Sequence, residues 1–285
     1  MYSLILEDEQ RHQLIFNQLG GRFQITDIQG LNPPGADINT SEAALIDGEI
    51  FNSSKLQMRT VNLAFAIDYD AERSRMEVYR VIHSKKPIRL YYKSEYRDIY
   101  IDGYVQEVDF SYFEKKQICT VSIICPQPYL KSVEEIIEEL TAVLPMFHFP
   151  FASTEAPEIV FGVLDTEARK VVNNESGLSA GLIIQFDAIR PVSNPKIYNY
   201  ETREFFGLNG TLQAGDKITV DTSSGEKTIT LLRNGIESNA FNMLEKGSTW
   251  LQLYPGVNEF YTEVSSGSLI DLYVTIKYRS NYEGV

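Results

Sequence analysis

The sequence is poor in the residues that most often carry out chemistry. It contains three histidines, His12, His83 and His148, and two cysteines, Cys119 and Cys125. These residues do not form an HExxH or CxxC pattern, so we expect no metal site. The GxSxG and glycine-rich phosphate-binding patterns are also absent from the sequence. We therefore expect no catalytic residues, no cofactor and no enzymatic activity.

Positive charge is scarce as well. The chain has 26 lysine and arginine residues against 39 aspartate and glutamate residues, a formal net charge of −13 and an isoelectric point near 4.8. A protein that binds nucleic acid needs a basic surface that displaces counterions from the phosphates. No long run of lysine and arginine provides such a surface. We expect no nucleic-acid partner.

Long hydrophobic runs are missing, and a disulfide bond is not expected. No stretch of about 18 apolar residues occurs, which predicts no membrane span. The segment Met1–Glu7 has no positive charge at its start and turns acidic, which argues against a secretory signal. Cys119 and Cys125 would lie roughly 20 Å apart on one strand, whereas a disulfide allows ~7 Å between Cα atoms. Two buried, reduced thiols are expected, as in proteins made in a reducing cytoplasm.

What the chain does contain is an excess of strand-forming residues. It has 17 tyrosines and 15 phenylalanines, beside many valines, isoleucines and threonines, and these residues favour strands. Strict alternation predicts a half-buried strand whose apolar face carries Val61, Leu63, Phe65, Ile67 and Tyr69. Further strands are predicted at Arg89–Tyr92, Ile99–Val108 and Gln117–Ile124.

Two short helices are predicted among these strands. The first begins after Asp70, which can cap it, and is expected to end near His83. Its apolar stripe contains Met76, Tyr79 and Ile82, widened by Val78 and Val81. The second helix is predicted over residues 132–141, because Ser132 and Glu135 have capping-box spacing. Apolar residues there repeat at i, i+3, i+4 and i+7, namely Val133, Ile136, Ile137 and Leu140.

Residues 30–56 are rich in glycine, proline, asparagine and serine. The segment is too long for an ordinary loop, so it is predicted to be a projecting hairpin or arm. Such a segment can add a strand to another subunit. The candidate residues for an intersubunit contact are Pro33, Pro34, Ile38, Leu45, Ile50 and Phe51.

The second half of the chain reads as a separate all-β block. An aromatic, proline-rich junction at 144–157 precedes it, and short strands with regular turn signals then predict a β-sandwich or jelly roll. In the strand that begins at Trp250, the leucines Leu251 and Leu253 share the face expected to be buried. Trp250 and Tyr254 take the other face, with Tyr261 on the next strand. These aromatic residues either contact a sugar or protein partner or are covered by their own chain.

Three stretches resemble one known family in their order along the chain. They are Arg59–Asp70 with the helix behind it, Cys125-Pro126-Gln127-Pro128-Tyr129, and Trp250–Phe260. Over essentially its whole length the chain resembles the distal tail proteins (Dit) of long-tailed phages, also called siphovirus tail components. The resemblance implies a mainly β fold. An N-terminal split-β-barrel-like domain with a helix, residues 1–145, would be followed by a galectin-like β-sandwich, residues 146–285.

The resemblance also implies a role in assembly. Members of the family form a hexameric ring at the tip of the tail tube, and the N-terminal domains build that ring. The implied partners are other copies of the chain, the tail tube protein, a tail-associated lysin or tail fibre protein, and a receptor-binding protein. The implied location is the virion tail tip, after synthesis in the host bacterial cytoplasm. The alternative is a carbohydrate-binding module of a phage adhesion device that contacts host surface polysaccharide.

Overall fold

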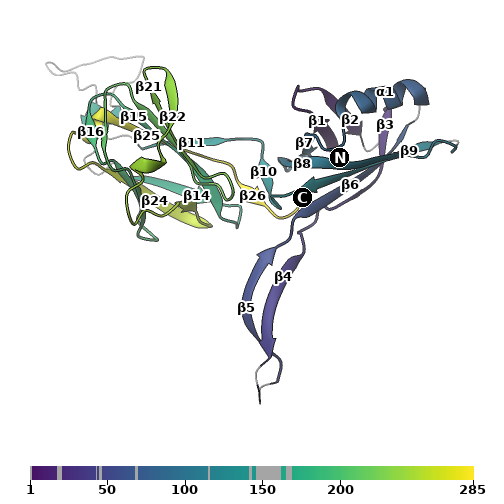
Figure 1. Cartoon of the computed structure of the whole chain (residues 1–285), viewed down its shortest axis with the longest axis horizontal. Helices are drawn as coiled ribbons and strands as arrows, with labels where there is room; N and C mark the ends of the chain where they lie inside the picture. The colour runs from purple at the N-terminus through teal and green to yellow at the C-terminus, as the bar shows by residue number, and fades with distance from the viewer. Residues whose placement is uncertain are drawn as a thin grey trace, which may run out of the picture. The chain divides into compact units, whose positions relative to one another are not determined.

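The chain folds into two compact units. The computed structural model describes residues 2–17, 21–42, 44, 47–67, 70–114, 116–140, 143–145, 162–164 and 169–285. The first unit contains Met1–Glu134 together with Asn281–Val285, and the second contains Glu135–Ser280 (Figure 1). The chain therefore passes from the first unit to the second and returns to the first for its last five residues. The predicted boundary between residues 145 and 146 borders a stretch outside the described residues and stays a prediction.

The first unit is a closed barrel with one helix and one projecting hairpin. Its elements are β1 (Ser3–Glu7), β2 (Gln13–Asn17), β3 (Phe23–Gln29), β4 (Ala36–Glu42), β5 (Glu49–Leu56), β6 (Arg59–Ile67), α1 (Ala71–Val81), β7 (Pro87–Lys93), β8 (Asp98–Phe110), β9 (Gln117–Cys125), β10 (Leu130–Ser132) and β26 (Asn281–Tyr282). The strand order is β8-β7-β1-β2-β3-β6-β9, and β9 pairs back with β8 to close the barrel. Closure pairs the strands that would otherwise be edges. The predicted mainly β fold with an N-terminal barrel and helix is confirmed.

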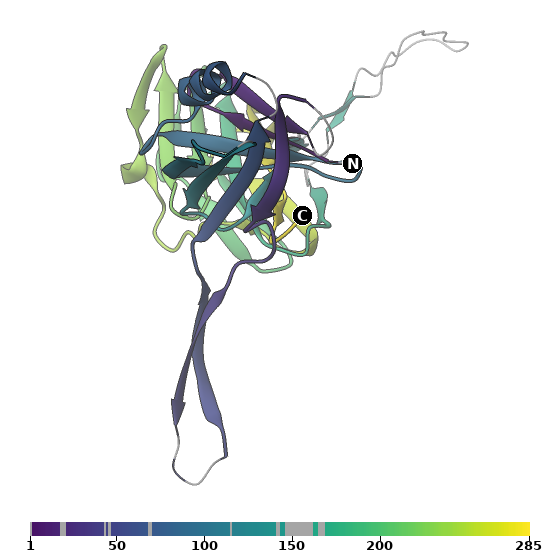
Figure 2. The same cartoon turned by 90° about the vertical axis from the view of Figure 1, so that its right-hand side faces the viewer.

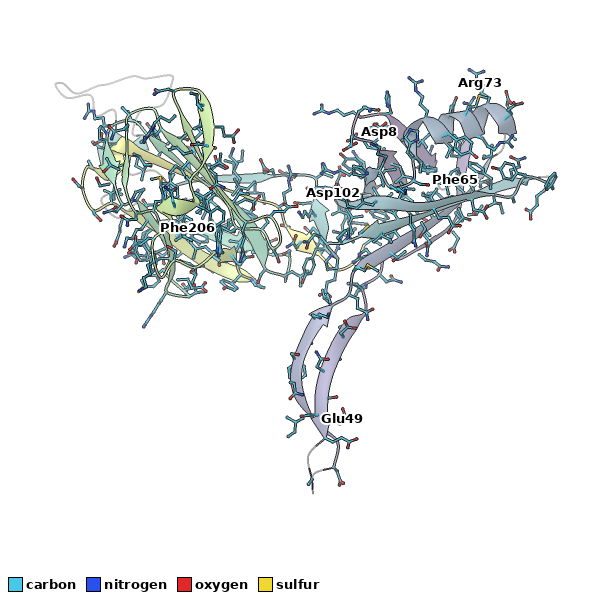
Figure 3. The ribbon with its side chains drawn as sticks, in the orientation of Figure 1. Asp8, Glu49, Phe65, Arg73, Asp102 and Phe206 are labelled. Atoms are coloured by element: carbon cyan, nitrogen blue, oxygen red, sulfur yellow. The ribbon has the colours of Figure 1, made fainter. Side chains whose placement is uncertain are left out.

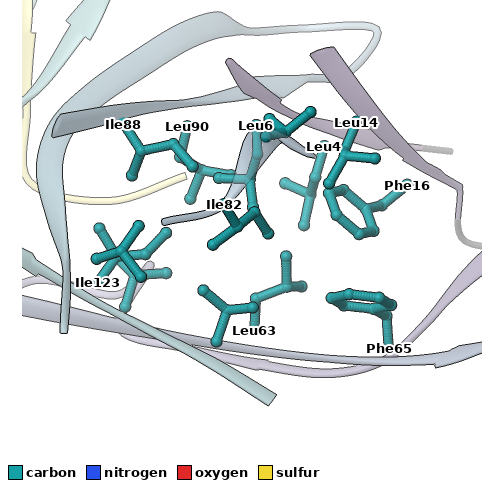
Figure 4. Close-up of a cluster of buried hydrophobic side chains, with 14 of the residues drawn as sticks. Leu4, Leu6, Leu14, Phe16, Leu63, Phe65, Ile82, Ile88, Leu90 and Ile123 are labelled. Atoms are coloured by element: carbon teal, nitrogen blue, oxygen red, sulfur yellow. The ribbon is translucent and has the colours of Figure 1, made fainter. Parts of the chain in front are cut away.

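The alternating apolar side chains of β6 form the centre of the barrel core. Val61, Leu63 and Phe65 are fully buried there, and side chains of β1 and β2 meet them in one cluster (Figure 4). The ring centroids of Phe16 and Phe65 are 4.7 Å apart, in the range preferred by aromatic pairs. Tyr69, predicted for the same face, lies outside the described residues.

Helix α1 forms where it was predicted, and part of its apolar stripe packs on the barrel. The Asp70 side chain accepts a hydrogen bond from the Arg73 amide, as expected of a cap. Val78, Val81 and Ile82 are buried, so these predicted apolar residues do pack inward. Met76 and Tyr79, the other members of the predicted apolar stripe, are 65% and 43% exposed, so the barrel covers only part of that stripe. One face of the helix thus joins the buried cluster of the barrel, and most of the other side chains are at least partly exposed.

The helix predicted at 132–141 does not form in its described residues, 132–140. Residues Ile136–Leu140 form β11, which pairs antiparallel with β25 (Leu272–Tyr278). The Ser132 hydroxyl donates to the Glu134 carbonyl instead of forming a capping box. The edge of a sheet offers these residues a full ladder of hydrogen bonds, and this tertiary interaction outweighs the local helical pattern.

In the part of the second unit that the structure describes, the regular structure is short strands and two single-turn 3-10 helices, η1 (Phe241–Met243) and η2 (Leu269–Asp271). Beside β11 and β25 the strands are β12 (Val143–Pro145), β13 (Gly162–Leu164), β14 (Lys170–Asn174), β15 (Ala180–Ala188), β16 (Val192–Ser193), β17 (Lys196–Asn199), β18 (Glu204–Gly207), β19 (Thr211–Leu212), β20 (Lys217–Asp221), β21 (Thr228–Arg233), β22 (Ile236–Asn239), β23 (Gln252–Leu253) and β24 (Gly256–Glu263). One sheet has the order β11-β25-β15-β20-β21-β22, with β23 beside β15, and another has the order β14-β24-β17-β18. Phe186 from the first sheet and Phe206 and Phe260 from the second share one buried cluster. This arrangement is a β-sandwich.

Both cysteines are buried and reduced, as predicted. Burial raises the pKa of the Cys125 thiol to about 12 and also raises the pKa of Cys119.

The folded protein should therefore resist alkylation by iodoacetamide near pH 8, whereas both thiols should react in denaturant. Intact-mass spectrometry measures the difference. Because unfolded thiols titrate near 8.5, their share of folding stability is intact below that pH and is lost as the pH rises toward 12. Alkylation of the folded chain at the rate of a free cysteine would contradict the buried environment.

Candidate interaction surfaces

The arm predicted at 30–56 is a two-stranded hairpin. Strands β4 and β5 pair from Ala36 with Leu56 at the base to Glu42 with Glu49 near the tip, and the hairpin projects from the barrel (Figures 1 and 2). An isolated two-stranded hairpin is marginally stable in water, and its outer edges present unpaired backbone groups. The arm, defined here as residues 36–56, is therefore a surface suited to a partner.

The structure places the candidate arm residues in two groups. Ile38, Ile50 and Phe51 lie on the hairpin and are 64%, 49% and 62% exposed. Pro33 is exposed and Pro34 half-buried, and both precede the hairpin at its base. Leu45 lies outside the described residues. Large apolar side chains in solvent on a narrow hairpin have nothing of their own unit to pack on, which is typical of a contact surface.

The base of the arm is held by a buried arginine, which the sequence analysis did not single out. Arg59 is 2% exposed and its guanidinium donates to four backbone carbonyls. Nε donates to Pro128 (2.8 Å), Nη1 to Gly30 (2.6 Å) and Asn32 (2.8 Å), and Nη2 to Glu283 (2.7 Å). Burial lowers the pKa of this guanidinium.

This arginine joins three segments that are far apart in sequence. They are the approach to the arm, the turn after β9 and the last residues of the chain. The last residues are tied down further, since the Val285 amide donates to the Leu31 carbonyl (3.3 Å) and Arg97 Nη1 to the Gly284 carbonyl (2.6 Å). The sequence did carry a signal for this residue. Arg59 lies two residues before Val61, so the two-residue period of a strand places both side chains on the buried face of β6.

A second exposed surface lies on α1 and the turn between β8 and β9. We call Arg73, Met76, Tyr79, Arg80 and Tyr112 the α1 surface. The Tyr79 and Tyr112 hydroxyls share a hydrogen bond of 3.1 Å, which raises the pKa of Tyr79 to about 12. Arg73, Met76 and Arg80 stand at i, i+3 and i+7, so they form one stripe along the helix.

In the second unit the three candidate aromatic residues do not form one platform. Trp250 is half-buried against the core, with its ring centroid 5.6 Å from that of Phe206 and 5.6 Å from that of Phe241. The Tyr254 hydroxyl donates to Glu204 Oε2 (3.1 Å). Among the described residues, no ring contact joins Trp250, Tyr254 and Tyr261 to one another.

Tyr261 belongs instead to a row of aromatic rings across the second sheet. Its ring stacks on that of Tyr198 with centroids 4.8 Å apart, and Tyr198 contacts Phe205 in turn. The Arg169 guanidinium lies 5.9 Å from the Tyr261 centroid and precedes β14, the strand on the opposite side of β24 from β17. The faces of the Tyr261 ring are therefore used within the sheet, whereas sugar stacking needs an open ring face. Glycan contact by these residues stays a prediction.

The described residues offer little else for chemistry. No cluster of His, Cys, Asp and Glu among them could hold a metal ion, and none of their helices has the length and apolar character to span a membrane. His12 Nδ1 contacts Asp8 (2.9 Å), which has a lowered pKa in spite of the opposing effect of burial. His83 is exposed beyond α1. His148 lies outside the described residues.

Comparison with family models finds two matches, one within the first unit and one that covers most of the second. Residues 10–125 match the phage tail protein RIFT-related domain, and residues 163–282 match the C-terminal domain of the siphovirus-type tail component. No curated protein sequence matches the chain.

Solved structures share the fold over the whole chain. The crystal structure of Dit from phage SPP1, described as a paradigm of the hub adsorption apparatus in phages that infect Gram-positive bacteria, has 12% sequence identity and a TM-score of 0.66. That match covers 98% of this chain and 99% of the other. A chain of the phage P2 baseplate in its activated conformation with calcium has 11% identity and a TM-score of 0.53, covering 100% and 99%. The same baseplate with strontium gives 10% identity, a TM-score of 0.55 and full coverage of both chains.

Proposed function

Because this chain belongs to the siphovirus-type tail component family, we propose that it forms the hexameric ring at the distal end of a phage tail. It is a structural protein of the distal tail. The observation that carries the proposal is the pairing of the two family domains in one chain with a barrel that projects an otherwise unsupported arm. The ring would connect the tail tube to the tail lysin or fibre and to receptor-binding proteins at the tail tip.

The first unit has the features that a ring needs. The barrel is closed, so its strands are not available for growth by sheet extension. The arm is the part that can reach a neighbour. A contact between the arm of one copy and a different surface of the next is heterologous, and a heterologous contact makes a ring when its rotation closes.

The partners proposed beyond other copies of the chain follow from the assemblies to which the similar structures belong. SPP1 Dit is described as a hub, and the P2 chain is part of a baseplate. A hub binds components on more than one side, which suits a chain with two separately folded units. The tail tube protein, the tail lysin or fibre protein and the receptor-binding protein are therefore the partners to test.

Removing the arm should abolish the ring. The Gln57 amide donates to the Gly35 carbonyl (2.9 Å), so residues 36–56 can be replaced by an Asn-Gly turn without moving the base. The wild type is expected at the mass of a hexamer of 32.4 kDa chains and the shortened protein at the mass of one chain, as measured by light scattering.

The matched control for the arm replacement changes exposed apolar side chains elsewhere. Ile236 and Val257 in the second unit are 71% and 59% exposed, and a variant with alanine at both should keep the hexamer. Thermal unfolding of the shortened protein checks that the barrel is intact. A shortened chain that folds and still runs as a hexamer would refute the role of the arm.

A further inference from the structure

The outer part of the arm carries negative charge without any positive charge. Between Ile38 and Ser54 the sequence contains Glu42, Asp47 and Glu49 and no lysine or arginine. Glu42 and Glu49 stand directly opposite each other across the hairpin. Like charges in that position repel each other and destabilise a hairpin. The approach of a cation relieves this repulsion. The exposed Ile50 and Phe51 follow Glu49 on the same strand.

The segment that carries most of the α1 surface is positively charged. Residues 71–86 contain five lysines and arginines against two glutamates, although the whole chain has a net charge of −13. One of the two, Glu77, is paired with Arg22. Arg73 and Arg80 are exposed, and no ion pair to either is found within the described residues. Between them on the helix lie the exposed apolar side chains Met76 and Tyr79.

The two surfaces cannot meet within one copy. Glu49 near the end of the arm and Arg73 on α1 lie on opposite sides of the first unit (Figure 3). Figures 1 and 2 show the same separation from two directions at right angles. Any pairing of their charges must therefore join two copies of the chain.

We propose that the arm of one copy docks on the α1 surface of a second copy. The carboxylates of Glu42 and Glu49 lie near Arg73 and Arg80, and Ile50 and Phe51 pack on Met76 and Tyr79. The inference rests on the proposed ring and identifies the surface that receives the arm. Complementary charge also gives the contact its direction, since the arm of one copy would repel the arm of another.

Exchange of the charges tests the contact in the full-length protein. Glu42→Lys with Glu49→Lys moves the formal net charge from −13 to −9, since each change adds two. Arg73→Glu with Arg80→Glu moves it to −17. Each pair alone should raise the concentration needed for half-assembly by about tenfold or more, because attraction becomes repulsion. The four changes together restore both the pairing and the original net charge, so assembly should return to within about threefold of the wild type.

The controls separate docking from general repulsion and from misfolding. If net charge alone governed assembly, the Glu42→Lys, Glu49→Lys variant would assemble more tightly than the wild type, and that result would overturn the inference. Arg190→Glu with Lys246→Glu makes the same charge change in the second unit and should leave assembly near that of the wild type. Asp70 caps α1 through the backbone of Arg73, so the cap survives the exchange, and thermal unfolding checks this.

A covalent trap gives an independent measurement. Both natural cysteines are buried, so cysteines introduced as Phe51→Cys and Met76→Cys are the accessible ones. Mild oxidation should give a ladder of linked chains on a non-reducing gel, whereas Phe51→Cys with Ile236→Cys should not. If the wild type is a hexamer, the charge variants assemble as the wild type does and the Phe51→Cys, Met76→Cys protein gives no ladder, the docking site is overturned and the ring stands. A wild type that is monomeric at every concentration overturns both.

Discussion

Replacing Arg59 by methionine should lower the free energy of unfolding of the first unit by about 3–5 kcal/mol. The change removes four hydrogen bonds from a charged donor at once and leaves four backbone carbonyls without that partner. A buried acceptor that loses its donor costs about 1–3 kcal/mol, and the methionine side chain recovers part of this by filling the space. The approach to the arm and the last residues of the chain should loosen together.

The position of the only tryptophan makes this effect measurable. Trp250 belongs to the second unit, so its fluorescence follows that unit during urea unfolding. The fluorescence transition should stay in place in the Arg59→Met protein, while hydrogen exchange at Leu31 and Val285 becomes faster. Hydrogen exchange thus follows the first unit and tryptophan fluorescence the second. Separate signals are needed because a protein of two units need not unfold in a single transition.

Two variants bracket the Arg59 result. Arg59→Lys keeps the charge but cannot reproduce the planar fork of donors, so it should lie between the wild type and Arg59→Met. Arg97 also donates to the last segment, at Gly284, and its guanidinium lies 4.7 Å from the Tyr282 ring centroid, but its side chain is exposed. Arg97→Met should therefore cost less than about 1 kcal/mol. Equal effects of Arg59→Met and Arg97→Met would show that burial of Arg59 is not what matters.

Gly30→Ala should be similarly damaging, by about 3–5 kcal/mol. Gly30 has a φ of +89°, a conformation that L-residues with a side chain rarely adopt. A Cβ at this position would stand 2.0 Å from the Thr60 carbonyl oxygen and 3.0 Å from the Val61 Cα, both on the backbone of β6. Backbone of a central barrel strand cannot move aside as a flexible side chain can. The same substitution would also displace a carbonyl that Arg59 binds.

Gly48 supplies the matched control for this substitution. It has the same φ of +89°, but a Cβ there would have nothing within 4 Å. Gly48→Ala carries the conformational cost alone, about 1 kcal/mol, and this falls on the arm rather than the barrel. The difference between the two variants, measured by urea unfolding of the first unit, isolates the clash with β6. If Gly30→Ala unfolded at the same urea concentration as Gly48→Ala, the close approach would be disproved.

Much of the fold could be predicted where the pattern is local. Alternation of apolar residues placed Val61, Leu63 and Phe65 inside the barrel, and Leu251 and Leu253 inside the second unit. Both features follow from the two-residue period of a strand, which is a property of its own backbone. The composition of residues 30–56 likewise predicted a projecting segment, and the order of motifs along the chain predicted the family.

The prediction failed where a partner distant in sequence decides the structure. Residues 136–140 have the apolar spacing of a helix, yet they form β11 because β25 supplies the partner for a ladder. Periodicity also left open which part of the α1 stripe is buried, since Val78 and Ile82 pack on the barrel whereas Met76 and Tyr79 stay exposed. Periodicity states which conformations a segment tolerates, whereas contacts made across the fold select among them.

The sequence by itself determined the periods of the strands, the position of α1, the presence of the arm and the family to which the chain belongs. These properties depend on residues that are neighbours along the chain. Only the tertiary structure decided that β8 and β9 close the barrel and that Arg59 binds carbonyls of residues 30, 32, 128 and 283. It alone placed an acidic arm and a basic helix on opposite sides of one unit. Such relations join residues remote in sequence, and they exist only once the chain has folded.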